Sequence, residues 1–400
     1  MIMKEKILLA FSGGLDTSFC AIYLAKEKNF EVHSAIVNTG GFSQQELARI
    51  EAHALRLGVK NHIVLDATED YYSRCLKYML FGNSLRNRNY PLSVSSERSF
   101  QAIALVEYAT KNGFKKIAHG STAAGNDQVR FDLTIRVLAP YIEVITPIRE
   151  LSISRENEIK YLAENDIIME AKQVQYSINK GLWGTSVGGK ETLTSHQELP
   201  ETAYPSGDPK EGTEVVKIRF DKGEPVALND ESMNPVDVIR KLDEIGATYA
   251  IGRDVHVGDT IIGIKGRVGF EAPGARMLID AHLALEKHVL TRWQLHWKEQ
   301  IGSWYGMFVH EAQFLEPVMR NLEDFLSSSQ SNVTGDVTIR LRPYSHQVTG
   351  ITSEYDLMNP EFAAYGEESK DWKPEDVDGF TKIMGNQQKI WYLINKKHTE

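Results

Sequence analysis

The stretch ILLAFSGGLDTS, residues 7–18, decides the fold of the first part of the chain. An apolar run of strand length begins at Ile7, and a turn of one serine and two glycines follows it. Glycines let the backbone approach a ligand closely, and a helix is expected to begin near Asp16 with its free N–H groups facing the same place. Because ligands bind at the carboxyl ends of strands in open α/β sheets, these features predict a phosphate site.

Two better-known phosphate motifs do not match this stretch. It lacks the Gly-Lys-Ser/Thr ending of a Walker loop, and its glycines are adjacent rather than spaced as in a dinucleotide-binding motif. A tight turn that binds nothing is the alternative, but two glycines, three hydroxyl residues and an acid at a strand exit form an unusual combination.

The rest of the first 150 residues repeats the alternation of strand and helix. Apolar runs VHSAIVNT, HIVLDA, KKIAHGS and IEVITPI follow as further strands. A capping box, Ser43 to Glu46, opens one of the helices between them, and Gly58 suits a left-handed exit from it. Apolar strands alternating with helices predict a doubly wound α/β domain, a parallel sheet covered on both faces.

Beyond about residue 170 the pattern changes to α+β. Polar, glycine-rich stretches precede the strand-like EVVKIRF, and Asn234-Pro235 is typical of a helix start. TIIGIKG (260–266) and GDVTIRLRPYS (335–345) are expected as strands, and residues 275–327 as mostly helical, with Pro317 at a helix start. The last thirty residues, charged and then apolar, are expected to be a helical tail that packs on another surface.

Composition excludes several classes of protein. The 400 residues carry 45 Lys and Arg against 54 Asp and Glu, a formal charge of −9, which argues mildly against a nucleic-acid partner. Apolar residues make up 42%, too many for wholesale disorder, and no run approaches a membrane span or forms a secretory leader. Cys20 and Cys75 show no metal-ligand spacing and suggest reduced thiols in a cytoplasmic protein. The histidines show no metal-ligand spacing either.

Two motifs resemble those of a known family. SGGLDTS is similar to the SGGxDS/T loop of the N-type ATP pyrophosphatases, and HGSTAAGNDQVRFD (119–132) is similar to the HGxTGKGNDQVRFE stretch of the argininosuccinate synthases. GNS (82–84), KGRVGFEAP (265–273), SEYDL and VDGF extend the resemblance over nearly the whole chain. It implies three parts: an ATP pyrophosphatase domain (1–168), an α+β synthetase domain (169–368) and an oligomerisation tail (369–400) of a homotetramer.

The resemblance also implies a reaction. ATP and citrulline would form a citrullyl-adenylate and pyrophosphate, and aspartate would then displace AMP to give argininosuccinate, a step of arginine biosynthesis. Magnesium is expected with ATP, but no metal held by the protein itself. Catalysis is expected to come from positioning and electrostatic stabilisation.

The family's sites are carried over residue by residue. ATP would be held by Ala10, Phe11, Ser12, Gly13, Gly14, Leu15, Asp16, Thr17, Ser18, Val37 and Gly120. The amino-acid substrates would be bound by Ser84, Thr122, Asn126, Asp127, Arg130, Ser177, Ser186 and Phe270. Asp16, Asp127 and Arg130 are the expected catalytic residues. A solvated i,i+3 helix pair is the alternative for Asp127 and Arg130. His119 is expected to make a backbone contact rather than act as a base.

Several positions depart from the family pattern. The family's Gly-Lys-Gly is Ala123-Ala124-Gly125 here, and its tyrosine before GTS falls on Met79. A glutamate and a tyrosine that touch citrulline in the family fall on Gly258 and Phe270. Asp259 could replace the lost carboxylate. Alternatively, the substrate is an N-acylated citrulline, whose nitrogen needs no counter-ion, with Arg86 and Arg88 of a longer LRNRNYPL segment pairing with an acyl carboxylate.

Two other functions are alternatives for this sequence. RNA sulfuration uses the same loop but relies on a reactive cysteine pair and a tRNA-binding surface, which Cys20, Cys75 and the acidic charge do not favour. A nucleotide-sensing module without chemistry would not release pyrophosphate in response to citrulline and aspartate.

Overall fold

The structure is a computed structural model that describes residues 4–123, 125–168, 176–362 and 371–397. The chain divides into two compact units, residues 1–354 and residues 355–400. In the described ranges, no helix is both long and apolar enough to cross a membrane.

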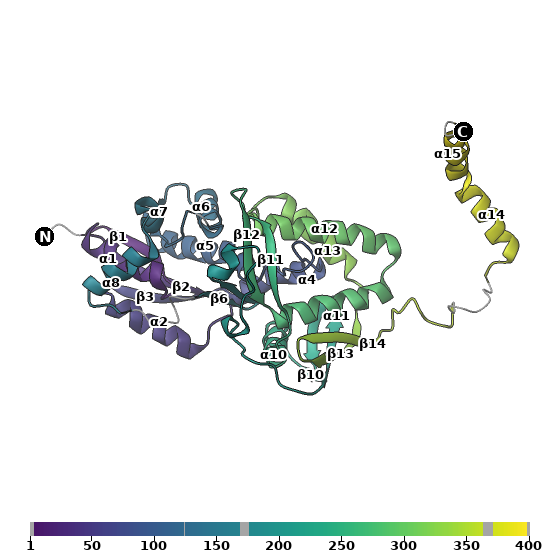
Figure 1. The fold of residues 1–400 in the computed structure, drawn as a ribbon, viewed down its shortest axis with the longest axis horizontal. Coiled ribbons are helices and arrows are strands. Elements are labelled where there is room, and N and C mark those ends of the chain that lie inside the picture. The colour runs from purple at the N-terminus through teal and green to yellow at the C-terminus, as the bar shows by residue number, and fades with distance from the viewer. Residues whose placement is uncertain (1–3, 124, 169–175, 363–370, 398–400) are drawn as a thin grey trace. The chain divides into compact units, whose positions relative to one another are not determined.

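The first unit opens with a parallel five-stranded sheet in the order β3-β2-β1-β4-β5, which confirms the predicted α/β class. Its strands are β1 (Lys6–Ala10), β2 (Glu31–Asn38), β3 (Asn61–Asp66), β4 (Lys116–Ala118) and β5 (Glu143–Ile145). The helices of this part are α1 (Leu15–Lys26), α2 (Gln44–Arg56), α3 (Thr68–Tyr71), α4 (Lys77–Phe81), α5 (Ser93–Lys111), α6 (Asp127–Leu138), α7 (Pro147–Leu151) and α8 (Arg155–Glu164), with a π-helical turn at Tyr72–Leu76. Figure 1 shows helices on both sides of this sheet.

Strand β1 is buried because its side chains alternate between two helical layers. Ile7 and Leu9 pack in a core cluster with residues of α1, α2 and α8, whereas Leu8 packs in a cluster with residues of α5 and α6. Apolar residues at the successive positions Ile7, Leu8 and Leu9 therefore suit a strand that is covered on both faces. The capping box of α2 is present as predicted, with the Ser43 and Glu46 side chains each bonded to the other's backbone N–H.

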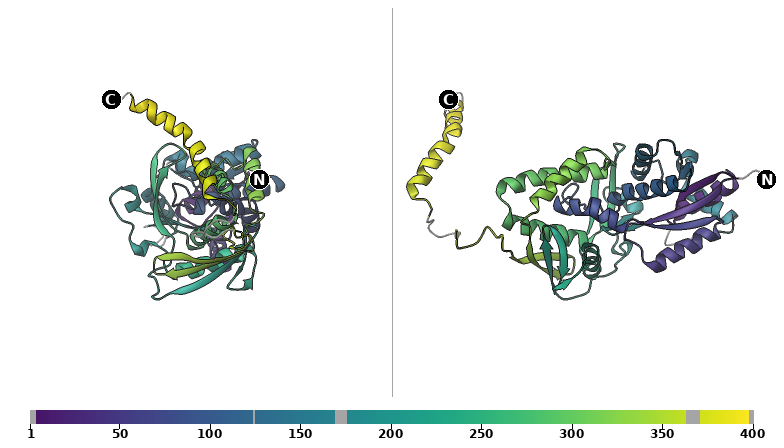
Figure 2. Two further views of the ribbon diagram at one scale, coloured as in Figure 1. Left: turned by 90° about the vertical axis from the view of Figure 1, so that its right-hand side faces the viewer. Right: turned by 180° about the vertical axis from the view of Figure 1, so that it is seen from behind.

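The rest of this unit contains two antiparallel sheets and four longer helices. One sheet has the order β10-β9-β8-β13-β14 and the other the order β11-β12-β7-β6. The strands are β6 (Ser177–Gly181), β7 (Gly184–Gly188), β8 (Glu214–Asp221), β9 (Glu224–Leu228), β10 (Glu231–Ser232), β11 (Arg253–Asp259), β12 (Lys265–Glu271), β13 (Gly335–Arg342) and β14 (Ser345–Thr352). The helices are α10 (Pro235–Ala247), α11 (Pro273–Val289), α12 (Arg292–His310) and α13 (Val318–Ser329), with 3-10 turns at Lys190–Leu193 and Glu201–Ala203. Figure 2 shows these strands and helices lying beside one another in the view from behind.

One predicted strand is wrong. Residues 260–264 of TIIGIKG form the turn between β11 and β12, and only Lys265 and Gly266 lie in a strand. The Thr260 hydroxyl accepts from the N–H of Ile264, and Gly263 adopts a φ of 81°. A tight turn thus interrupts an apolar run whose isoleucines suggested a continuous strand.

A buried polar network joins α11 and α12 to the turn after α4. Lys298 Nζ lies 2.7 Å from Glu286 Oε2 and donates to the carbonyl of Phe81 at 2.6 Å. Asn83 and Gln330 also donate to the Glu286 carboxylate, at 2.6 and 2.9 Å. The Lys298 and Glu286 side chains are almost wholly buried, at 2% and 0% exposure. Each therefore relies on the other to balance its charge.

The second unit contains helices α14 (Pro374–Met384) and α15 (Asn386–Lys396). Its large apolar side chains are exposed, among them Phe380, Ile383, Trp391 and Ile394. The helical character agrees with the prediction for the tail. The predicted domain boundaries at 168/169 and 368/369 border or fall within the ranges 169–175 and 363–370, which are outside the described residues, and they stay predictions.

Candidate functional site

A large cavity of about 1340 Å³ lies within the first unit, at the carboxyl ends of β1, β2 and β4. The starts of α1 and α6, one face of α5, the hairpin β6–β7 and the turn after β11 complete its walls. Its volume exceeds the roughly 300–1,000 Å³ usual for a pocket that holds one small ligand. A cavity of this size has room for more than one substrate.

The glycine loop forms one end of this cavity. Residues 10–17 all line it, as do Val37 and Gly120, in agreement with the predicted positions. Gly13 has a φ of 78°, and Gly14 precedes α1 without a side-chain cap, so the first N–H groups of α1 remain available to a ligand. A Cβ atom on Gly120 would lie 3.2 Å from Asp16 Cβ, which shows how closely the exit of β4 packs on the loop.

Ser18 does not line the cavity, although it was predicted to contact ATP. Its side chain is buried under the loop, where the hydroxyl donates to the Gly14 carbonyl at 2.8 Å and lies 2.9 Å from His53 Nε2. Ser18 therefore supports the loop from below. The reason is helical geometry, because Ser18 lies four residues after Gly14, so its hydroxyl reaches back to the carbonyl of the preceding turn.

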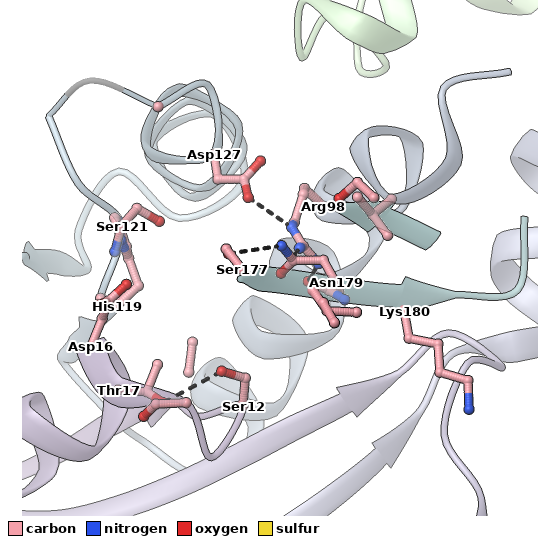
Figure 3. A pocket seen from close by; sticks show the side chains of 18 of the residues that line it. Ser12, Asp16, Thr17, Arg98, His119, Ser121, Asp127, Ser177, Asn179 and Lys180 are labelled. Atoms are coloured by element: carbon pink, nitrogen blue, oxygen red, sulfur yellow. Dashed lines mark hydrogen bonds and ion pairs between the residues drawn. The ribbon is translucent and has the colours of Figure 1, made fainter. Parts of the chain in front are cut away.

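Asp127, at the start of α6, contacts two arginines, and Figure 3 shows the contact with Arg98. Its Oδ2 accepts from Arg98 Nε at 3.0 Å, and its Oδ1 accepts from Arg130 Nη1 at 2.8 Å. Burial would raise the pKa of Asp127, but the two guanidinium groups outweigh it and hold the pKa at about 2. Asp127 is therefore an anion at neutral pH. Arg130 is 3% exposed, so the alternative of a solvated surface pair is wrong.

Arg130 also connects α6 to the second half of the chain. Its Nε and Nη2 donate to the His310 carbonyl at 3.2 and 3.0 Å, and Nη2 lies 3.1 Å from His310 Nδ1. The side chain of Asn126 accepts from the N–H of Ile261 at 2.8 Å. The residues that begin α6 are thus fixed by contacts from both halves.

The hairpin β6–β7 covers the cavity from another side. Ser177 and Ser186 line it as predicted, and Arg98 Nη2 donates to Asn179 Oδ1 at 3.1 Å. Arg98 therefore ties the hairpin to Asp127 as well as to its neighbour Glu97. Glu97 is almost fully buried and binds Thr39 at 2.6 Å; burial raises its pKa to about 7.

Ser84 and Phe270 were predicted to bind substrate, but neither lines the cavity. The Ser84 hydroxyl is buried and donates to the carbonyl of Gly302 at 2.8 Å, and Phe270 is 1% exposed within the core. Among the other predicted substrate residues, Thr122, Asn126, Asp127 and Arg130 do line it. Ala124 is outside the described residues.

Three residues that were not predicted from the sequence line the cavity, whereas Ser84 does not. Tyr90, Ser95 and Arg98 line the cavity, whereas Met79 does not. Tyr90 precedes α5, and Ser95 and Arg98 lie on it. The register of the GTS and LARP motifs stays a prediction.

The remaining candidates have structural roles. His119 lines the cavity; its Nε2 lies 2.9 Å from Asp132, and its Nδ1 accepts from the backbone N–H of Ser121, which is the predicted kind of contact. That it does not act as a base stays a prediction. The Asp259 carboxylate lies 2.6 Å from Lys265 in an exposed pair, so it is not free to replace the lost glutamate. Neither Arg86 nor Arg88 lines the cavity.

The two cysteines do not form a reactive pair. Both are buried in different core clusters, and burial raises the pKa of each thiol. A protonated, buried thiol is a poor nucleophile, which argues against sulfur transfer. Across the described ranges there is no group of three or more His, Cys, Asp or Glu side chains placed to hold a metal ion.

Comparisons with known proteins agree with this geometry. A family model described as the arginosuccinate synthase N-terminal HUP domain matches residues 6–168, and one described as the arginosuccinate synthase C-terminal domain matches residues 176–391. The argininosuccinate synthase of Methanocaldococcus jannaschii is 36% identical over 99% of this chain and 100% of its own. Those of Dictyoglomus thermophilum and Xanthomonas campestris are each 37% identical over 98% of this chain, and over 98% and 100% of their own.

Proposed function

The chain belongs to the argininosuccinate synthase family, and from this premise we propose how its cavity joins citrulline to aspartate. The chain is a ligase with argininosuccinate synthase activity, which serves arginine biosynthesis and uses ATP.

In the first step, ATP binds at the glycine loop. The N–H groups of the Gly14 turn and of the start of α1 bind the phosphates, and Gly120 leaves room beside them. The ureido oxygen of citrulline attacks the α-phosphorus, the bond from that phosphorus to the bridging oxygen breaks, and pyrophosphate leaves. Asp16, whose carboxylate lies beside the loop, would hold the Mg²⁺ that accompanies ATP, and this ion would neutralise triphosphate charge.

In the second step, the amine of aspartate attacks the ureido carbon, loses a proton and displaces AMP. We assign Thr122, Asn126 and Asp127 to aspartate, because a hydroxyl, an amide and an anion suit an amino acid. Asp127 binds and orients rather than accepting the proton, since a carboxylate with a pKa of about 2 is a weak base. Arg130, Ser95, Ser177 and Ser186 complete the site on the citrulline side.

One observation carries this proposal: the glycine loop and the Arg98–Asp127–Arg130 group line the same cavity. The cavity can therefore hold ATP and two amino acids at the same time. Because the reactants are already bound next to one another, the reaction does not require three molecules to collide in solution.

Pyrophosphate release tests the proposed reaction. We expect release from ATP to require a citrulline compound, to continue to AMP only with aspartate, and to stop when a chelator removes the divalent cation. Continuous pyrophosphate detection with AMP chromatography measures all three dependences. Release that is independent of any citrulline compound would contradict the ligase mechanism, and full activity under chelation would contradict the Mg²⁺ proposal.

We also propose a homotetramer in the cytoplasm. The exposed apolar side chains of α14 and α15 supply a contact surface, and two unpaired, buried cysteines agree with a reducing compartment. Removing residues 371–400 is expected to lower the molar mass measured by light scattering from that of four chains to that of a smaller species. A truncated protein that remains tetrameric would show that the tail is not the assembly contact.

A further inference from the structure

The glycine loop lies against a face of α2 that carries two arginines. A Cβ atom on Gly13 would lie 3.4 Å from Ile50 Cγ1, so this helix packs directly on the loop. Arg49, His53 and Arg56 follow one another on α2 at spacings of four and three residues, and all three line the cavity. Such spacings place side chains on one face of a helix. The phosphate end of the cavity therefore has a basic wall.

The glycine loop itself supplies no positive side chain. Residues 10–17 read AFSGGLDT, and their one charged side chain is the carboxylate of Asp16. The backbone N–H groups at the start of α1 carry partial charges, whereas the terminal phosphates of ATP are full anions. A guanidinium group binds phosphate through two parallel N–H donors. Arg49 and Arg56 thus offer the charge that the loop lacks.

Neither guanidinium is neutralised by an acidic neighbour. Among the described residues, no ion pair joins Arg49 or Arg56 to a carboxylate, and both arginines are exposed. Glu46, the acid on the same wall, caps α2 and contacts Lys180 instead. The two positive charges are therefore available to an anionic ligand in the cavity.

The ring of His53 reports the positive charge of this wall. Burial lowers its pKa, and the guanidinium groups of Arg56 and Arg49 lower it further. Arg56 Nη2 lies 2.9 Å from His53 Nδ1, and this nitrogen must accept because a guanidinium group can only donate. In the neutral ring, Nε2 then donates to Ser18 Oγ at 2.9 Å, and the Ser18 hydroxyl donates to the Gly14 carbonyl at 2.8 Å. A chain of hydrogen bonds thus connects Arg56 to the glycine loop.

We propose that Arg49 and Arg56 form a diphosphate subsite on α2, which binds the two terminal phosphates of ATP and then the pyrophosphate that leaves. The two arginines are seven residues apart, about 10 Å along the helix axis, so their long side chains can reach both ends of a diphosphate group between them. Negative charge develops on this group as its bond to the α-phosphorus breaks, and the guanidinium groups stabilise it there. The inference rests on the proposed function and adds a binding site to it.

Product inhibition tests this inference, because one product carries the diphosphate group and the other does not. Formation of argininosuccinate is followed by chromatography at fixed ATP, citrulline and aspartate, with added pyrophosphate or added AMP. In Arg49→Gln and Arg56→Gln we expect the inhibition constant of pyrophosphate to rise about tenfold, the size of one lost hydrogen bond between charged groups. The inhibition constant of AMP should be unchanged, since AMP has no terminal phosphates.

Matched variants separate charge at this wall from charge elsewhere on the protein. Arg136 is an exposed arginine of α6 that does not line the cavity, so Arg136→Gln should leave both inhibition constants as in the wild type. Arg49→Lys and Arg56→Lys keep the charge but lose the paired donors, and we expect them to recover part of the affinity for pyrophosphate.

Two results would overturn the inference. An unchanged inhibition constant of pyrophosphate in Arg49→Gln and Arg56→Gln would show that the two arginines are a solvated face that binds nothing. Equal rises for pyrophosphate and AMP would show that the variants distort the loop. A wild-type protein that forms no argininosuccinate contradicts the proposed function instead, and calorimetric titration of the same variants with pyrophosphate then tests the subsite without turnover.

Discussion

Asp127→Asn is expected to lower kcat/KM by about 10- to 100-fold without unfolding the protein. The change keeps the shape of the side chain but removes the anion between Arg98 and Arg130, which lie 3.0 and 2.8 Å away. The two arginines are 11% and 3% exposed but Asp127 is 40% exposed, so the loss is that of hydrogen bonds to a charged group, about 1.5–3 kcal/mol, where about 1.4 kcal/mol corresponds to a factor of ten. Pyrophosphate release with varied aspartate measures the loss, which we expect mainly in the aspartate dependence.

Asp259→Asn is the matched control for this prediction. Asp259 also lines the cavity, but its carboxylate pairs with the exposed Lys265, and exposed pairs contribute little. We expect its kcat/KM to stay within about twofold of wild type. If Asp127→Asn and Asp259→Asn behave alike, Asp127 is not the anion that the aspartate site requires.

The pH dependence of Asp127 gives a second readout. Its folded pKa of about 2 lies below the value of about 3.9 for an unfolded chain. The ion pairs therefore contribute fully to stability above pH ~4 and are lost as the pH falls through about 2. An acid limb of activity near neutral pH should accordingly come from another group.

Glu286→Gln is expected to lower the free energy of unfolding by about 3–5 kcal/mol, because it leaves the buried Lys298 ammonium without its anion. Burial lowers the pKa of Lys298 and the Glu286 carboxylate raises it back in part, which shows how much the charge depends on this partner. Urea unfolding followed by circular dichroism measures the change, with the slope m expected to be constant.

Two further variants separate charge from packing at this position. Adding Lys298→Met to Glu286→Gln removes the unpaired charge and should recover much of the lost stability. Glu164→Gln breaks an exposed pair with Lys160 and should change stability by less than about 0.5 kcal/mol. A loss below about 1 kcal/mol in Glu286→Gln would show that water reaches Lys298 and replaces the carboxylate.

The parallel sheet could be predicted from sequence because local patterns and packing agree there. Ile7, Leu8 and Leu9 are apolar at successive positions since both faces of β1 are covered, and Ser43 and Glu46 form the capping box that their spacing predicts. At Thr260–Ile264 a turn interrupts an apolar run, so the apolar residues predicted a strand where the structure has a turn.

The site was predictable where one motif supplies its residues and not where separate segments meet. Residues 10–17, Asn126, Asp127 and Arg130 were predicted and do line the cavity, because each set follows a strand or begins a helix in one stretch of sequence. Arg98 was missed because its importance comes from partners on α6 and β6, which are 29 and 81 residues away along the chain. Ser84 was predicted from a short GNS match, whereas its hydroxyl is buried against the carbonyl of Gly302 and does not line the cavity.

The contact between Arg130 and His310 joins residues 180 positions apart and has a consequence during protein synthesis. The glycine loop leaves the ribosome early, but His310 at the far wall of its cavity is translated much later, and such distant contacts form late in folding. A nascent chain therefore carries a nucleotide loop without the surroundings needed to activate citrulline.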